Sequence, residues 1–168
     1  SMIASNSDLA SKAGVEILKK GGNAVDAAVA TGFAMAVTYP QAGNIGGGGF
    51  MVIRMADGRN AAMDYREIAP LAAARNMYLD ADGKLTDKSR HGALAVGVPG
   101  AVAGIAAALA KDGTMSLHDV MQPAIRLADS GFTVDSALYR SIRGGAKLIG
   151  PYEGASLFLP GGQPVAPG

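Results

Sequence analysis

Arg66 is the residue whose type and position are best suited to chemistry. It follows two apolar runs, Phe50–Met55 and Asn60–Tyr65, which read as neighbouring strands. The Asp57-Gly58 pair between them favours a tight hairpin turn and places Arg66 where the second strand ends. A guanidinium there can pair a carboxylate through two parallel, charge-assisted hydrogen bonds. From the residues alone, a solvated surface charge is the alternative interpretation.

Four consecutive glycines, Gly46–Gly49, stand directly before the first of these strands. Glycine lets another backbone or a ligand approach closely. A phosphate-binding loop needs a strand, the glycines, Gly-Lys-Ser/Thr and then a helix, whereas here a helix-like segment precedes and a strand follows. Two interpretations remain, a close approach beside a binding site and a turn that only permits tight packing.

The composition excludes several classes of function. The 168 residues carry a formal net charge of +1, from 15 basic and 14 acidic residues, so no electrostatic footprint for nucleic acid or an anionic membrane is present. The absence of cysteine excludes disulfides and thiol chemistry, and the two histidines, His91 and His118, leave little for a metal site. The longest apolar region, Ala24–Val37, is shorter than a membrane span and contains Asp26.

The length suits one domain or a piece of a longer protein. Residues 1–2, Ser-Met, look like the remnant of a tag joined to a chosen boundary. Residues 159–168 have no helix or strand period, so we expect an irregular end without an element that ties it down. From this irregular end we expect that the chain was truncated within a longer protein.

The first 40 residues carry clear helix signals. Ser7 is placed to cap a helix over Asp8–Lys20, and Gly21-Gly22 are placed to end it. Asn23 can cap a second helix over Ala24–Val37, whose apolar residues occur on nearly all sides, as in a helix buried between layers.

The remaining elements alternate between short strands and helices. The pattern predicts a helical turn near Leu71–Arg75, a hairpin at Asp82-Gly83, and a strand or extended segment over His91–Val98. It also predicts helices over Ala101–Lys111, Ser116–Asp129 and Asp135–Leu148, the last interrupted at Gly144-Gly145. This order favours an α+β fold with sheet and helices in stacked layers rather than a simple alternating βαβ series.

Several motifs together carry a family resemblance. They are GGNAVDAAVA (Gly21–Ala30), PQAGNIGGGGFM (Pro40–Met51), DYREIAP (Asp64–Pro70), GVPGAVAG (Gly97–Gly104) and GTMSLHDVMQPAIRLADSGF (Gly113–Phe132). In this order and spacing the chain resembles the γ-glutamyltranspeptidases over essentially its whole length.

The resemblance implies an N-terminal-nucleophile hydrolase with an αββα sandwich, made as a precursor that cleaves itself into a large and a small subunit. Residues 1–168 would be the N-terminal portion of the large subunit. The family's nucleophile is the threonine that begins the small subunit, with its own amine as base. That threonine is outside this chain, so we expect no catalytic residue here and no activity from the fragment alone. None of the chain's own five threonines is expected to catalyse: Thr31, Thr38, Thr86, Thr114 and Thr133.

One substrate contact carries over by resemblance. The arginine of the family's R-E-x-A-P motif grips the α-carboxylate of the γ-glutamyl group and falls on Arg66. Glu67 would hold Arg66 in position or support the substrate network, with a plain salt bridge as the alternative. The glycine run becomes structural support near the substrate pocket, and neither a metal nor a cofactor is implied.

The function implied is γ-glutamyl transfer and hydrolysis of glutathione and related γ-glutamyl amides, through a γ-glutamyl-enzyme that water or an amino-acid or peptide amine resolves. The partners implied are these donors and acceptors and the small subunit, and the location implied is periplasmic or secreted. A cephalosporin (glutaryl) acylase with the same self-cleaving chemistry is an alternative. A non-catalytic binding or assembly domain is another.

Overall fold

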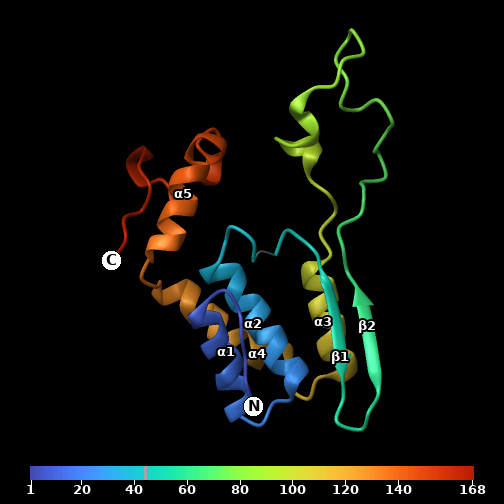
Figure 1. Ribbon diagram of the computed structural model, residues 1–168, viewed down its shortest axis with the longest axis vertical. Helices are drawn as coiled ribbons and strands as arrows, with labels where there is room; N and C mark the ends of the chain where they lie inside the picture. Colours follow the sequence, from blue (N-terminus) through green and yellow to red (C-terminus); the bar gives the residue numbers. More distant parts are fainter. Residues whose placement is uncertain (44) are drawn as a thin grey trace. The chain divides into compact units, whose positions relative to one another are not determined.

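The structure is a computed structural model that describes residues 1–43 and 45–168, so that Asn44 of the Pro40–Met51 motif lies outside the described residues. The chain divides into two compact units. Unit 1 is discontinuous and consists of Ser1–Asn44 and Asp112–Gly168. Unit 2, Ile45–Lys111, is inserted between its two parts. Helix and strand are both present, as the α+β prediction requires (Figure 1).

Unit 1 begins with two helices whose ends match the sequence signals within one residue. Helix α1 spans Asp8–Lys19, and the Ser7 hydroxyl caps it by accepting a hydrogen bond from the Ala10 amide. Gly21 adopts φ 93°, and the Gly22 amide donates to the Ile17 carbonyl at 3.1 Å. This pattern closes the last turn of α1 and explains why glycine stands there.

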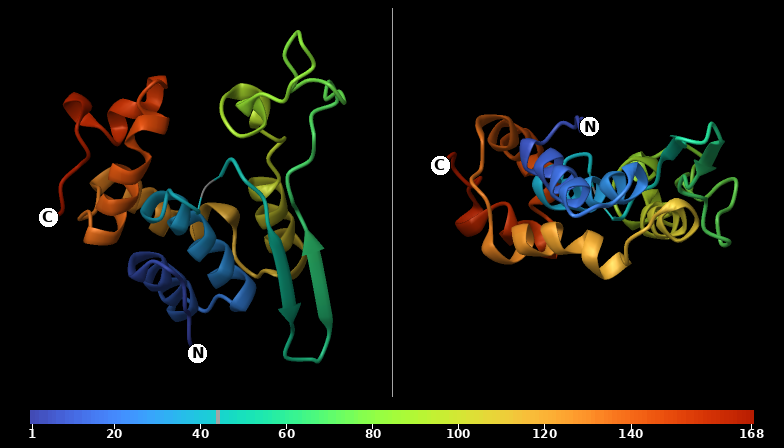
Figure 2. Two further views of the ribbon diagram at one scale, coloured as in Figure 1. Left: turned by 45° about the horizontal axis from the view of Figure 1, so that its top comes forward. Right: turned by 90° about the horizontal axis from the view of Figure 1, so that it is seen from below.

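Helix α2, Ala24–Thr38, is the centre of unit 1. It is buried on most of its surface, as predicted, and packs against α1 and against α4, Leu117–Ser130 (Figure 1). A Cβ at Gly14 of α1 would collide with the Thr31 hydroxyl, so α1 and α2 approach closely at that point. The second view shows the same three helices side by side (Figure 2).

The N-terminus of α2 is held by its capping residues. Asn23 accepts hydrogen bonds from the Val25 and Asp26 amides, and Asp26 accepts one from the Asn23 amide at 2.7 Å. Asp26 is fully buried. This reciprocal capping box satisfies amides that the first turn of a helix leaves free.

Helix α5, Ser136–Ile149, and the residues after it form a second small core in unit 1. Asp135 caps the helix through the Leu138 amide at 2.7 Å. Leu138 and Ile142 pack with Leu159, which is 7% exposed. Short 3-10 turns at Glu153–Leu157 and Pro160–Gly162 complete this region. The expectation that nothing ties down the last ten residues is therefore wrong for Leu159.

Unit 2 contains an antiparallel hairpin and one helix. Strand β1, Phe50–Arg54, pairs with β2, Asn60–Asp64, in a register that sets Phe50 opposite Asp64. The predicted turn is confirmed, because Gly58 has φ 88° and its amide donates to the Met55 carbonyl at 3.0 Å. Helix α3 covers Ala101–Asp112, and Figure 1 shows it beside the hairpin.

The hairpin at Asp82-Gly83 is also confirmed. An isolated bridge pairs Leu79 with Leu85, and Gly83 has φ 77°. Two other predictions for this part of unit 2 are wrong. Leu71–Arg75 forms no helix in the described residues, because Leu71 is fully exposed and an isolated turn of helix has no packing to support it.

Of the two alternatives for His91–Val98, a strand or an extended segment, the strand is wrong as well, and only the end of the segment is extended. A 3-10 turn occupies Ala93–Ala95, Gly92 before it has φ 87°, and within the segment only Val98 forms a bridge, with Ile68. Apolar content alone indicated a strand, but the positive φ at Gly92 turns the backbone away from a ladder.

The predicted break at Gly144-Gly145 is absent, because α5 runs through both glycines. Each glycine costs about 1 kcal/mol relative to alanine in a helix interior. Packing of Leu138 and Ile142 outweighs that cost here. No helix among the described residues has the length and hydropathy that crossing a membrane requires.

Candidate functional site

Arg66 follows the end of β2 by two residues, as the hairpin prediction required. The Asp64 carboxylate accepts a hydrogen bond from the Arg66 amide at 3.0 Å, which turns the backbone as the strand ends. The register of the hairpin brings this turn to the start of β1, where the glycine run ends.

Gly48 touches the backbone that carries Arg66. A Cβ at Gly48 would lie 2.5 Å from the Tyr65 carbonyl oxygen and 2.8 Å from both the Arg66 Cα and the Glu67 nitrogen. No side chain fits in that space. The glycine run therefore allows a close backbone approach beside Arg66, a contact that fits both interpretations drawn from its composition.

The N-terminal part of α3 also packs closely against the residue before Arg66, Tyr65. Cβ atoms at Gly100 and Gly104 would collide with the backbone and the side chain of Tyr65, respectively. The Gly47 carbonyl accepts hydrogen bonds from the Gly100 and Ala101 amides, both at 2.9 Å. Tyr65 is held by close contacts with these glycines, and burial raises the pKa of its hydroxyl.

The Arg66 guanidinium has two neighbours. Its Nε donates to Glu67 Oε2 at 3.1 Å, and its Cζ lies 5.7 Å from the centre of the Phe50 ring, within cation–π range. The side chain is 61% exposed, and among the described residues no group binds its two terminal nitrogens. These nitrogens form the fork that a planar carboxylate matches with two hydrogen bonds.

Glu67 is anchored to the backbone as well as to Arg66. Its pKa is lowered first by a hydrogen bond from its own amide, then by the side chain of Arg66, with a further contribution from the Gly48 amide. The carboxylate is thus ionised at neutral pH and held where it meets the guanidinium. The side chains of the two site residues predicted from the sequence thus contact each other, and Glu67 binds only the Nε of Arg66.

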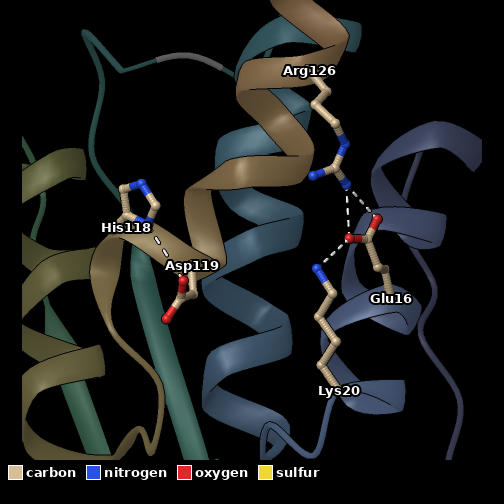
Figure 3. A network of polar contacts seen from close by, with 5 residues as sticks. All are labelled: Glu16, Lys20, His118, Asp119 and Arg126. Atoms are coloured by element: carbon tan, nitrogen blue, oxygen red, sulfur yellow. Dashed lines mark hydrogen bonds and ion pairs between the residues drawn. The ribbon is translucent and has the colours of Figure 1, made fainter.

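A second polar network lies in unit 1 (Figure 3). Arg126 of α4 donates to both carboxylate oxygens of Glu16 at 2.7 Å, and Lys20 donates to one of them at 2.8 Å. Lys20 and then Arg126 lower the pKa of Glu16. All three side chains are at least one-third exposed, so this network stabilises the contact of α1 with α4 only weakly. Its charged groups are paired with one another.

The histidines show no catalytic or metal-binding arrangement in the part of the chain that the structure describes. His118 is exposed and contacts Asp119 at 3.3 Å (Figure 3). No group of three or more potential ligands from His, Cys, Asp and Glu occurs among the described residues.

Four of the five threonines have structural contacts. The hydroxyls of Thr31 and Thr38 donate to helix carbonyls four residues earlier. That of Thr86 donates to the Tyr78 carbonyl at 2.7 Å, and that of Thr114 donates to Asp26 at 2.6 Å. Thr114 lies in the segment before α4, as predicted.

A cavity of about 350 Å³ lies in unit 1. It is lined by Asn6, Ser7, Asp8, Leu9, Thr38, Tyr39, Gln41, Phe132, Thr133, Asp135, Ala137 and Leu138. This lining contains two carboxylates and no basic side chain, so the cavity does not suit an anionic substrate group. Arg66 offers the better carboxylate site.

Phe50 is the one neighbour of Arg66 that the sequence did not single out. It was treated as the first residue of an apolar strand, yet its side chain is 63% exposed. The available signal was its position at the start of β1, because antiparallel pairing in a hairpin brings that end beside the residues that follow β2.

Arg66 and the glycine run lie in a part of the chain that matches a known protein family. The sequence model of the gamma-glutamyltranspeptidase family matches residues 10–168. The chain belongs to the gamma-glutamyltranspeptidase family. The motifs DYREIAP and PQAGNIGGGGFM both lie within the matched residues, and the family resemblance expected from the sequence is confirmed.

Individual members of the gamma-glutamyltranspeptidase family resemble the chain closely. It is 50% identical to a glutathione hydrolase proenzyme of Pseudomonas sp. strain A14, over 99% of this chain and 30% of that protein. It is 46% identical to the acylase ACY 1 proenzyme of Pseudomonas sp. strain V22, over 99% of this chain and 31% of that protein. The crystal structure of Helicobacter pylori gamma-glutamyltranspeptidase matches with a TM-score of 0.96 at 43% identity, over 100% of this chain and 49% of that chain.

The chain thus spans about 30% of the length of the curated relatives it matches. All of this chain matches the fold of the corresponding part of the Helicobacter pylori enzyme.

Proposed function

We propose that the complete protein containing this chain transfers γ-glutamyl groups from glutathione and related amides to water or to amino-acid and peptide amines. The observation that carries the proposal is the free terminal fork of Arg66, held beside Glu67 in a segment shared with the gamma-glutamyltranspeptidases. Glutathione presents a γ-glutamyl group with a free α-carboxylate, which is the group that such a fork recognises.

In this proposal Arg66 binds the α-carboxylate end-on through its two terminal nitrogens. Glu67 accepts the hydrogen bond of the Arg66 Nε and thereby orients the fork. Charge-assisted hydrogen bonds of this kind fix orientation as well as affinity. The γ-carbonyl of the donor is then presented at a defined distance from the carboxylate clamp.

The proposed nucleophile is the threonine that self-cleavage of the precursor exposes at the start of a small subunit. Its hydroxyl oxygen bonds to the γ-carbonyl carbon while its α-amine takes the hydroxyl proton. The bond to the leaving amine breaks, that amine receives the proton, and a γ-glutamyl ester remains. Water or an acceptor amine attacks the ester and returns a proton to the threonine oxygen. These groups supply nucleophile and base, so the proposed chemistry needs neither metal nor cofactor.

Residues 1–168 act in this scheme as the N-terminal portion of the large subunit. The hairpin β1–β2 and the helices contribute to an αββα sandwich that the small subunit completes. A periplasmic or secreted location, which the family resemblance implies, is part of the proposal.

The test uses the complete reading frame that contains this chain. Precursor cleavage is followed by gel electrophoresis, and turnover by release of a chromogenic amine from a γ-glutamyl anilide. Cleavage with turnover supports the proposal. A protein that neither cleaves nor turns over the anilide is a non-catalytic relative, which would refute it.

An acylase activity is the second candidate, because the acylase ACY 1 proenzyme is 46% identical to this chain, close to the 50% of the glutathione hydrolase. A glutaryl amide has the same chain length as a γ-glutamyl amide but lacks the α-amine. Comparing glutaryl and γ-glutamyl anilides separates the two, since only the acylase turns over the glutaryl compound faster.

A further inference from the structure

We propose that Phe50 is a positioning residue for Arg66: its ring lies beneath the guanidinium within cation–π range and directs the terminal fork of Arg66 toward the donor carboxylate. This inference rests on the proposed function, because it assigns a specificity role within the same site. It concerns a contact between two side chains that are sixteen positions apart in the sequence.

The hairpin fixes the position of Phe50. Its Cα is paired with that of Asp64, and the neighbouring residues Gly49 and Tyr65 exchange two backbone hydrogen bonds, at 3.0 and 3.4 Å. The backbone that carries the Phe50 ring is therefore paired with the two residues that precede Arg66, Asp64 and Tyr65. The Arg66 guanidinium carbon lies 5.7 Å from the ring centre.

The exposure of Phe50 separates this role from ordinary packing. Its side chain is 63% exposed, and it is absent from the buried core of the described residues. Among the described residues the ring therefore fills no core, and its contact with the cation is the side-chain interaction that the structure shows for it.

Phe50 and Glu67 restrict the guanidinium from two directions. Glu67 accepts the hydrogen bond of Nε at 3.1 Å, and the guanidinium carbon lies over the Phe50 ring, 5.7 Å from its centre. A long arginine side chain otherwise samples many rotamers, and each must be restricted when the fork binds a carboxylate. Phe50 reduces that loss in advance, so removing the ring should weaken donor binding more than the chemical step.

The experiment compares four variants of the complete, self-cleaved protein. Phe50→Leu and Phe50→Met remove the ring in two ways, and Phe50→Tyr retains it. Tyr139→Leu is the matched control, because Arg143 lies 6.0 Å from the Tyr139 ring in a similar cation–π contact within α5. Kinetics with a γ-glutamyl anilide and the thermal midpoint are measured for each.

We expect the two ring-removing variants to raise KM by about threefold to fivefold, with kcat within about twofold, as the loss of an exposed cation–π contact predicts. Phe50→Tyr should retain the KM of the parent, and Tyr139→Leu should leave it unchanged. In an Arg66→Ala background, Phe50→Leu should have no further effect. A merely structural role would lower the thermal midpoint and would persist without Arg66.

Two results would overturn the inference while the proposed function stands: an unchanged KM in Phe50→Leu and Phe50→Met, or an equal loss in Phe50→Tyr, each in a protein that Arg66→Ala cripples. A parent enzyme that does not turn over the γ-glutamyl anilide, or is indifferent to Arg66→Ala, overturns the proposed function and this inference with it.

Discussion

Asp26 accepts two hydrogen bonds from Thr114, one from its hydroxyl at 2.6 Å and one from its amide at 2.9 Å. A further bond comes from the Met115 amide at 3.1 Å. Burial by itself would raise the pKa of this carboxyl, but the hydrogen bonds from Thr114, Asn23 and Met115 outweigh it and lower the pKa. The carboxylate joins the start of α2 to the segment that leads into α4.

Asp26→Asn should lower the free energy of unfolding by about 2–3 kcal/mol, since hydrogen bonds to charged groups contribute about 1.5–3 kcal/mol each. An asparagine amide is itself a donor, so the Asn23 amide would lose its buried acceptor. Urea unfolding of the complete protein measures this. Asp119→Asn is the control, because Asp119 also pairs with a helix-capping serine but is exposed. An equal decrease in the free energy of unfolding of both variants would show that the burial of Asp26 does not strengthen its contribution.

The stability that Asp26 provides should depend on pH in a defined direction. Its pKa is lower in the folded than in the unfolded protein, where an aspartate titrates near about 3.9. The contribution is therefore complete above that value and is lost as the pH falls through the folded pKa. Unfolding midpoints measured from pH 7 down to pH 3 should converge for the parent and Asp26→Asn. A constant gap would contradict this linkage.

Arg66→Ala should weaken use of a γ-glutamyl donor by about 3 kcal/mol or more in kcat/KM, because two hydrogen bonds to a carboxylate are removed. Precursor cleavage should be largely spared. Arg59→Ala is the matched control, since Arg59 is also an exposed arginine paired with a nearby carboxylate, Asp57, in the hairpin turn. Donor kinetics that barely change would show that Arg66 is not the carboxylate clamp.

Glu67→Gln should have a smaller effect than Arg66→Ala. The amide can still accept from backbone groups, but it loses the charge that pairs with the Arg66 Nε. An exposed ion pair contributes little, so KM for the donor should rise by no more than about fivefold, with kcat preserved. Steady-state kinetics on a γ-glutamyl anilide test this, and a loss as large as that of Arg66→Ala would assign Glu67 a direct part in the reaction.

Gly48→Ala should impair donor use together with stability. Its Cβ would lie 2.5 Å from the Tyr65 carbonyl oxygen, so the backbone that carries Arg66 must shift. Gly144→Ala is the control within α5, where nothing lies within 4 Å of the added Cβ. That change should instead stabilise the protein by about 1 kcal/mol. Thermal unfolding and donor kinetics distinguish the two, and a neutral Gly48→Ala would exclude the close contact.

Local signals in the sequence predicted most of the helices of this chain. Ser7, Asn23 and Asp135 each cap the helix that follows, because capping depends on residues within one turn. The hairpins at Gly58 and Gly83 were predictable for the same reason, since their turn residues lie next to one another.

Features that depend on distant parts of the chain were not predictable from pattern. The bonds of Asp26 to Thr114 join residues 88 positions apart. The segment over His91–Val98 has the apolar content of a strand, yet only Val98 has a bridge partner, Ile68, and nothing in the segment indicates this. At the candidate site the motif identified Arg66 and Glu67, whereas the stacking of Phe50 required the register of the hairpin.

The discontinuity of unit 1 has a consequence for synthesis on the ribosome. Helices α1 and α2 are made first, but α4, against which α2 packs, follows only after all of unit 2. At about 5–20 residues per second, α2 waits several seconds with an apolar surface that has no partner from α4. The nascent chain therefore passes through an interval in which chaperones can bind α2, and slower translation through residues 45–111 would lengthen it.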